Sequence, residues 1–431
     1  MLSKFTGSFT VLWKFFKTSF SNSVFFKSFK MFSEFFHFFN YFPKTESRIL
    51  LKLIHPAITF PMAFLAFLVL SDFVASIYSY AIIFLGLSAF SIVAFISSKL
   101  KVNREKPFLG DASAIVGTFL IIVGLAFIVK CIIDAGRIPL LYPNVRLILD
   151  LISVELAFLF VPGTLLLVGY IGNLVHQEKL KRKIARNWIL LLATISSIII
   201  SLLGFRTETM VLLLGIFLIT AYQRIFNLCE SFVLLVTTVF ILIAMSILRH
   251  TLMGSTVTAD ILSSRFGASL AAFDYLANKA GLSGVTYGLI HTAGFWFLEV
   301  VPGPRNLIGY YIGAGYKSTT ATIFGPIVFD FGIVGVVIAM LILGSILGIG
   351  YKLATVTKDG FIVATHSLLF AFSLVGIETG LVDFIVYIYF ITGILVFLAA
   401  LIFLKHRKNF QFPYKIHGLG ENSFIEFKIK E

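Results

Sequence analysis

The chain has 431 residues, of which 58% are hydrophobic and only 13% are charged, and its mean hydropathy is +0.97. This composition excludes a soluble globular domain, because the surface of such a domain needs far more charge. Apolar runs of about 20 residues recur along the chain and predict an all-α, polytopic membrane protein. The formal net charge of +14 would suggest a nucleic-acid partner only in a soluble protein.

The first 48 residues are rich in Phe, Lys and Ser. They are too polar to span a membrane and lack the single apolar core and small-residue cleavage site of a secretory signal. We therefore expect residues 1–48 to be a basic interfacial segment on the cytoplasmic face. A transmembrane domain at 49–404 and a cytoplasmic tail at 405–431 follow it.

The apolar runs of the transmembrane domain predict ten spans. They lie at 50–70, 75–97, 113–133, 147–173, 189–204, 208–225, 231–248, 324–350, 361–380 and 383–404. Basic residues gather in alternate connections between these spans, at 99–106, 179–186, 352–358 and 405–408. Under the positive-inside rule these connections are cytoplasmic, which places both termini in the cytoplasm of a multi-pass protein of the cell membrane. The net charge is therefore mostly a topological signal, and nucleic acid is not an expected partner.

The opposite face receives one long connection, at about 249–323, and loops of this length are usually functional. Within it, residues 263–281 carry apolar side chains at 266, 270, 273, 277 and 280, a helical stripe. Arg265 and Asp274 make this segment too polar to span, so we expect an amphipathic helix at the outer interface. The following apolar patch, 284–306, is interrupted by Gly and Pro, which predicts a partly buried, non-helical or re-entrant segment.

Arg206 lies between two long apolar runs, with Glu208 two residues later. A charge at such depth costs a few kcal/mol unless it meets water, a partner or an anionic ligand. Further cations share the outer side: Arg137, Arg146, Arg249, Arg265, Arg305 and Lys317. Each has a structural interpretation, as a snorkelling or salt-bridged charge. Together they would suit a diphosphate, since guanidinium groups give bidentate, permanently charged contacts. Arg206 and Arg305 are the strongest candidates for this role.

Four residues are candidates for a general base: Glu208, Asp274, His291 and Asp330. Glu208 is equally explained as the structural partner of Arg206, and His291 and Asp330 as satisfied buried groups. The sequence has no Asp-x-Asp pair, no His-x-x-x-His motif and no Walker loop. It therefore gives no support to a metal-dependent nucleotide-sugar transferase or to ATP-driven transport, and we expect neither a metal nor another cofactor.

The order of several short motifs is informative, although each is weak alone. They are GRIPLLYPNVR (136–146), GFRTETMVLLLG (204–215), GLSGVTYG (281–288), VPGPRN (301–306), STTATIFGP (318–326) and VFDFGIVGV (328–336), with VPG at 161–163 in the fourth span. This series resembles the oligosaccharide repeat unit polymerase family, the archaeal and bacterial relatives of Wzy-type O-antigen polymerases. The resemblance covers roughly residues 110–355.

The resemblance implies a GT-C-like membrane glycosyltransferase that works on the outer leaflet and builds a surface polysaccharide. Its substrate would be a polyprenyl-diphosphate-linked oligosaccharide, and its partners the lipid bilayer and, as candidates, a flippase and a chain-length regulator. The resemblance also implies metal-independent transfer, with Arg206 and Arg305 binding diphosphate and Arg137, Arg146, Arg265 and Lys317 assisting. It does not identify the base, so Glu208, His291 and Asp274 all remain candidates. A lipid-linked glycan ligase and a transporter of the same lipid are the alternatives.

Overall fold

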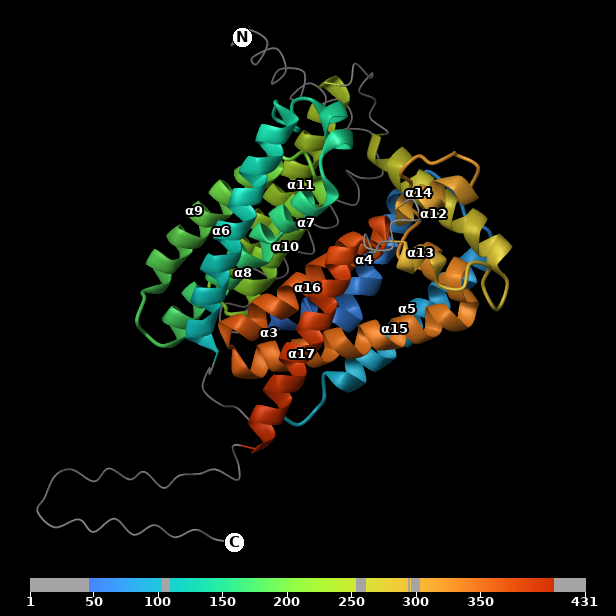
Figure 1. Cartoon of the computed structure of the whole chain (residues 1–431). Coiled ribbons are helices and arrows are strands. Elements are labelled where there is room, and N and C mark those ends of the chain that lie inside the picture. Colours follow the sequence, from blue (N-terminus) through green and yellow to red (C-terminus); the bar gives the residue numbers. More distant parts are fainter. Residues whose placement is uncertain (1–45, 103–108, 253–260, 294, 296–302, 407–431) are drawn as a thin grey trace, which may run out of the picture.

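The computed structural model describes residues 46–102, 109–252, 261–293, 295 and 303–406. Residues 1–45 of the expected interfacial segment and residues 407–431 of the expected tail lie outside this range. The described chain is helical and contains no strand (Figure 1).

The helices follow the predicted spans closely. The amino-terminal half contains α3 (Glu46–Leu53), α4 (Pro56–Leu70), α5 (Ile77–Ser97), α6 (Gly110–Ala135), a 3-10 turn η1 (Pro143–Ile148), α7 (Leu151–Phe158), α8 (Phe160–His176), α9 (Arg182–Ser201), α10 (Arg206–Tyr222) and α11 (Leu228–Leu252). The remainder contains α12 (Ile261–Ala280), α13 (Leu289–Thr292), α14 (Pro304–Tyr311), α15 (Phe324–Thr357), α16 (Gly360–Thr379) and α17 (Phe384–His406).

Eight described segments are long and apolar enough to cross a membrane. They are α5, α6, α7 with α8, α9, α11, α15, α16 and α17. The two other predicted spans form α4 and α10, which are shorter, with 15 and 17 residues. The polytopic all-α class is therefore confirmed, while the count of ten stays a prediction.

The helices form two groups joined by a central one. In Figure 1, α6 to α11 form one bundle, and α4, α5 and α15 form a second group that is strongly inclined to it. Between them α16 packs against α8 and α10 on one side and against α15 on the other. Helices α12, α13 and α14 lie together at the end of the second group (Figure 1), and we call this part the outer lobe after the side that the loop charges predict for it.

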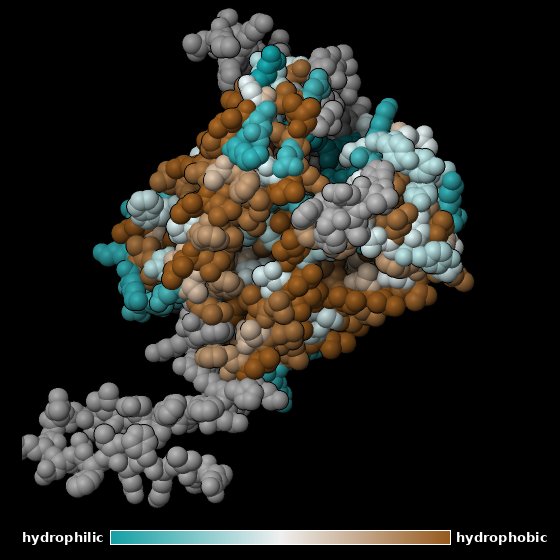
Figure 2. Space-filling view, in the orientation of Figure 1, coloured by the Kyte–Doolittle hydropathy of each residue, from teal (hydrophilic) through white to brown (hydrophobic). Residues whose placement is uncertain are grey.

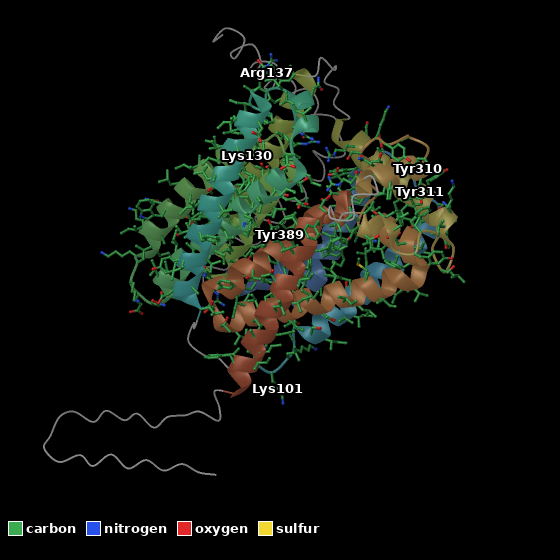
Figure 3. The ribbon with its side chains drawn as sticks, in the orientation of Figure 1. Lys101, Lys130, Arg137, Tyr310, Tyr311 and Tyr389 are labelled. Atoms are coloured by element: carbon green, nitrogen blue, oxygen red, sulfur yellow. The ribbon has the colours of Figure 1, made fainter. Side chains whose placement is uncertain are left out.

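The surface fits a protein embedded in lipid. Figure 2 shows hydrophobic residues over the flanks of both helix groups, whereas the outer lobe is mostly white to pale teal. Lys101 and Arg137, which the charge pattern places on opposite sides of the membrane, lie at opposite ends of the molecule (Figure 3).

The fourth predicted span is divided at Leu159 into α7 and α8. Pro162 explains this break, because proline has no N–H to donate to the carbonyl four residues earlier, that of Phe158. The hydroxyl of Tyr389 on α17 donates to this carbonyl at 3.3 Å. The break therefore fixes α17 against the first bundle.

A second break interrupts α15. Gly332 has φ 65° and ψ −165°, which is not helical, and a Cβ there would lie 2.0 Å from the carbonyl oxygen of Leu282. The interruption frees the carbonyls of Phe329 and Asp330, which accept hydrogen bonds from the backbone N–H groups of residues 285–287. Two of the sequence motifs, GLSGVTYG and VFDFGIVGV, are thus packed backbone to backbone.

The long outer connection agrees with its prediction in part. The amphipathic helix expected at 263–281 is confirmed as α12. The segment at 284–306 is expected to be non-helical or re-entrant, and the first alternative is wrong for two described stretches, since α13 and the start of α14 are helical. The re-entrant alternative stays a prediction. Helix α14 begins at Pro304, where proline fits because its missing N–H would have no helical partner.

Candidate functional site

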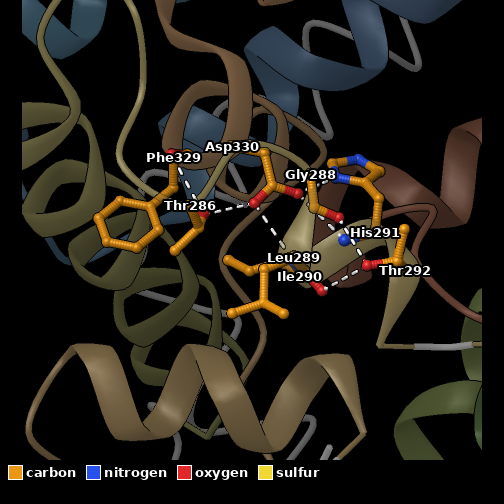
Figure 4. Close-up of polar contacts among 8 residues, drawn as sticks. All are labelled: Thr286, Gly288, Leu289, Ile290, His291, Thr292, Phe329 and Asp330. Carbon is orange, nitrogen blue, oxygen red and sulfur yellow. Dashed lines mark hydrogen bonds and ion pairs between the residues drawn. The ribbon is translucent and has the colours of Figure 1, made fainter. Parts of the chain in front are cut away.

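The break in α15 holds an imidazole–carboxylate pair (Figure 4). Asp330 is fully buried and accepts a hydrogen bond from Nδ1 of His291 at 2.5 Å. The same carboxylate accepts from the backbone N–H groups of Ile290 and His291, at 3.2 and 3.0 Å, and from the hydroxyl of Thr286. The motif that supplies Thr286 and the short helix α13 therefore converge on one acid.

This arrangement fixes the orientation of the imidazole. With Nδ1 donating to a carboxylate, Nε2 is the nitrogen left to accept a proton. The His291 side chain is 22% exposed whereas that of Asp330 is 0% exposed, so a reactant can reach only the histidine. The geometry is that of a general base oriented by an acid behind it.

A second group of charges comes from the first residues of α10 and α14 and from the residue before α17. Arg305, at the start of α14, is ion-paired with Asp383 just before α17, with 2.5 Å between Nη2 and Oδ2. Both charges act on Glu208 in the first turn of α10. Glu208 is 4% exposed, and its Oε2 has no hydrogen-bond partner among the described atoms. Glu155 on α7 interacts electrostatically with Asp383 as well.

Tyr387 of α17 connects the two groups. It interacts electrostatically with both Asp383 and Asp330, and its ring centroid lies 6.5 Å from that of His291. Its buried hydroxyl has no hydrogen-bond partner within the described part of the chain. We call the connected set His291, Asp330, Tyr387, Asp383, Arg305, Glu208 and Glu155 the polar cluster.

Two further arginines flank the turn that leads into α10. Arg206, the first residue of α10, donates to the Ser246 hydroxyl of α11 at 2.7 Å. Arg146 donates to the carbonyl of Gly204 at 3.0 Å and lies over the ring of Phe205. Arg206 has no ion-pair partner in the described structure, so Glu208 is not its structural partner. Within the described part of the chain, the partner of this guanidinium is a neutral hydroxyl.

The other predicted residues lie outside the polar cluster. Arg265 is ion-paired with Glu378 at the end of α16, Arg137 is exposed and lies over Tyr142, and Lys317 is exposed. The side chain of Arg249 is outside the described residues.

Asp274 has a clear structural environment. Its carboxylate accepts from the backbone N–H of Ser76, the residue that caps α5, at 2.8 Å. Burial raises the pKa of Asp274, but hydrogen bonds from Ser76, Ser79 and Asn278 outweigh it and the pKa is lowered overall. Asp274 therefore joins α12 to the start of α5 as an ionised group.

The sequence reasoning missed Glu155, Tyr387 and the site role of Asp383. Glu155 carried a signal, because it is an acid within an apolar span, where charge is costly. Tyr387 carried none, since tyrosines are common near membrane interfaces. Among the described residues, no three His, Cys, Asp or Glu side chains are grouped to hold a metal ion.

Comparisons with known proteins give a consistent picture. A family model described as putative O-antigen polymerase matches residues 53–390. An uncharacterized protein of Methanocaldococcus jannaschii is 31% identical over 341 residues, which cover 76% of this chain and 90% of that protein. No solved structure matches the chain.

Proposed function

The chain belongs to the O-antigen polymerase family, and from this premise we propose that it polymerises polyprenyl-diphosphate-linked oligosaccharide repeat units on the outer leaflet. The polymerase class, a membrane glycosyltransferase, follows from the family. The identity of the lipid-linked substrate, the leaflet and the roles of individual residues are our proposal.

The observation that carries the proposal is an acid-oriented imidazole in a polar cluster that also contains the guanidinium of Arg305. Arg206 forms no ion pair within the described structure and donates to the Ser246 hydroxyl, and it lies two residues before Glu208 in the chain. A guanidinium held by a neutral hydroxyl can exchange that contact for two bonds to a diphosphate oxygen pair. Arg146 of η1 contacts the turn before α10 and adds positive charge, while Arg305 assists from the Asp383 side.

The reaction that fits this arrangement is a direct glycosyl transfer. The hydroxyl oxygen of the acceptor's non-reducing sugar attacks the anomeric carbon of the donor, whose bond to the diphosphate oxygen breaks. The bonding electrons leave with polyprenyl diphosphate, and Arg206 stabilises the negative charge that develops there. His291 Nε2 takes the proton of the attacking hydroxyl, and Asp330 is a positioning residue that stabilises the resulting imidazolium.

Two of the predicted bases receive different roles. Glu208 is buried next to Asp383 and Arg305, where we propose that it helps to position Arg305 and does not take the proton. Asp274 is engaged at the start of α5, and we leave it out of the reaction.

Variants of Arg206 test the diphosphate role. Arg206→Ala and Arg206→Lys should both abolish long glycan and leave single repeat units on the lipid, because lysine lacks the bidentate geometry of arginine. Lys279→Ala is the matched control, since Lys279 is an exposed outer-lobe cation whose ammonium contacts Tyr275. A normal polymer ladder from Arg206→Ala would contradict this assignment. A ladder retained only in Arg206→Lys would show that Arg206 contributes positive charge but not bidentate hydrogen bonding.

A further inference from the structure

The outer lobe carries an exposed pair of stacked tyrosines. Tyr310, near the end of α14, and Tyr316 in the following loop have ring centroids 5.0 Å apart and planes within 13° of parallel. Their residues are 52% and 59% exposed. Large exposed aromatic surface is costly in a soluble lobe and usually marks a binding surface.

The loop geometry that forms the pair is specific. Gly313 and Gly315 have φ values of 83° and 68°, which side-chain-bearing residues rarely adopt. The chain therefore reverses, and the Lys317 backbone passes so close to Gly309 that a Cβ there would lie 2.0 Å from the Lys317 oxygen. The reversal brings Tyr316 beside Tyr310, whose ring also contacts the ring of Tyr311 edge-on, with 5.5 Å between the centroids.

The pair is connected to the polar cluster. Tyr310 lies five residues after Arg305 on α14, a rise of about 8 Å along the helix. The neighbouring Tyr311 packs its ring against Phe329, the residue before Asp330, with 5.0 Å between centroids. Figure 3 places Tyr310 and Tyr311 on the outer lobe. A chain leaving the polar cluster along α14 would reach the stacked pair within a short distance.

The surroundings distinguish this surface from one that faces lipid. On α15 the exposed residues Val334, Ile338 and Ile342 form an apolar row, as expected for contact with acyl chains. The residues around Tyr316 are instead Gly315, Lys317 and Ser318, all exposed. The outer lobe is also paler than the helices in the hydropathy view (Figure 2).

We propose that Tyr310 and Tyr316 form a carbohydrate-binding platform that holds the glycan chain next to the polar cluster. The inference rests on the proposed function for the identity of the chain. Sugar rings present flat C–H faces that stack on aromatic rings, while their hydroxyl groups remain in water or bond to polar neighbours such as Lys317. Holding a chain already several repeats long favours its further extension over its release, so the platform influences polymer length.

Direct binding tests the platform independently of catalysis. The probe is oligosaccharide of one to four repeats, released by mild acid from the source cells' own lipid-linked glycan, added to the full chain in nanodiscs. Tyr310→Ala and Tyr316→Ala should each weaken binding of the longest probe by about 3- to 10-fold, the range that the loss of one aromatic stack implies. Tyr310→Phe keeps the ring and should bind as the unaltered protein does. Tyr275→Ala is the matched control, because Tyr275 is another exposed tyrosine of the outer lobe.

Cells that carry these variants give the second measurement. The Ala variants should shift the glycan ladder toward shorter chains, whereas Tyr310→Phe and Tyr275→Ala should not. Unchanged binding in both Ala variants would overturn the platform. So would strong quenching of Tyr316→Trp fluorescence by brominated lipids, measured in a protein whose three native tryptophans are replaced by phenylalanine, because it would identify a membrane anchor instead. If the binding result holds but the protein makes no glycosidic bond, the platform stands and the polymerase proposal fails.

Discussion

Replacing Asp330 by asparagine tests the proposed base most sharply, because the change conserves size and removes charge. Oδ1 of Asp330 accepts from Thr286 and Ile290, and Oδ2 accepts from the N–H and Nδ1 of His291. An amide can serve only one of these two sides as an acceptor. With its oxygen toward His291, the Thr286 hydroxyl can turn to accept, and the Ile290 N–H alone loses its partner at a cost of about 1–3 kcal/mol. In the opposite orientation the amide NH₂ group would face the backbone N–H and the Nδ1–H of His291, which are also donors, so this orientation is disfavoured.

Asp330→Asn should therefore fold with slightly lower thermal stability and keep His291 near its place. It should nevertheless lose most of its activity, because the imidazolium formed in the reaction no longer faces a negative charge. General-base catalysis contributes about 10²–10⁴-fold, so we expect a rate loss of that order, no larger than that of His291→Ala.

The assay is the initial rate of glycan extension by the protein in proteoliposomes, with thermal unfolding recorded on the same sample. Thr286→Val is the control, since it removes one hydroxyl donor from Asp330 and leaves the His291 contacts intact. It should cost about 1 kcal/mol of stability and little rate. An Asp330→Asn protein that is folded and works at the normal rate would refute the base assignment.

Two further predictions concern the framework around the site. Gly332→Ala should destabilise the protein strongly and abolish activity, since the φ of Gly332 is 65° and a Cβ there would strike the Leu282 carbonyl. Gly136→Ala should lose only about 1 kcal/mol of stability, because Gly136 has a similar φ of 64° but no atom within 4 Å of the new Cβ. Equal unfolding temperatures in the two variants would contradict this prediction. Asp274→Asn should lower stability at neutral pH by about 1 kcal/mol without slowing the folded enzyme. Because the pKa of Asp274 is lowered from its ordinary value of 3.8, the stability that its carboxylate contributes is complete above that value and fades as the pH falls below it. If the stability difference between Asp274→Asn and the unaltered protein persists unchanged in strong acid, the ionised interaction with α5 is excluded.

The sequence predicted the helices well because hydropathy and loop charge report directly on membrane spans. All ten apolar runs form helices, and the segment at 263–281 with its apolar stripe forms α12. The breaks were harder to foresee. Pro162 gives a reason for the division between α7 and α8, but the interruption of α15 depends on the loop at 282–287, 45 or more residues earlier in the chain, which periodicity does not detect.

The candidate site was only partly predictable for a related reason. Lipid-facing and buried helix faces are both apolar, so the sequence does not show which helices meet. It therefore identified Arg206, Arg305 and His291 as costly polar residues without their partners, and the one pairing it offered, Glu208 with Arg206, is not an ion pair in the described structure. The partners Asp383 and Glu378 lie 78 and 113 residues from their arginines, and only the folded structure joins them.

The central claim is that this protein makes glycosidic bonds between lipid-linked repeat units. Purified protein in proteoliposomes, supplied with lipid-linked single repeats and excess EDTA, should produce a ladder of longer lipid-linked glycans. One polyprenyl diphosphate should be released for each addition. Movement of intact single repeats across the bilayer without a ladder would contradict the claim and identify a transporter, and a ladder that appears only when Mg²⁺ or Mn²⁺ replaces EDTA would contradict the metal-independent mechanism.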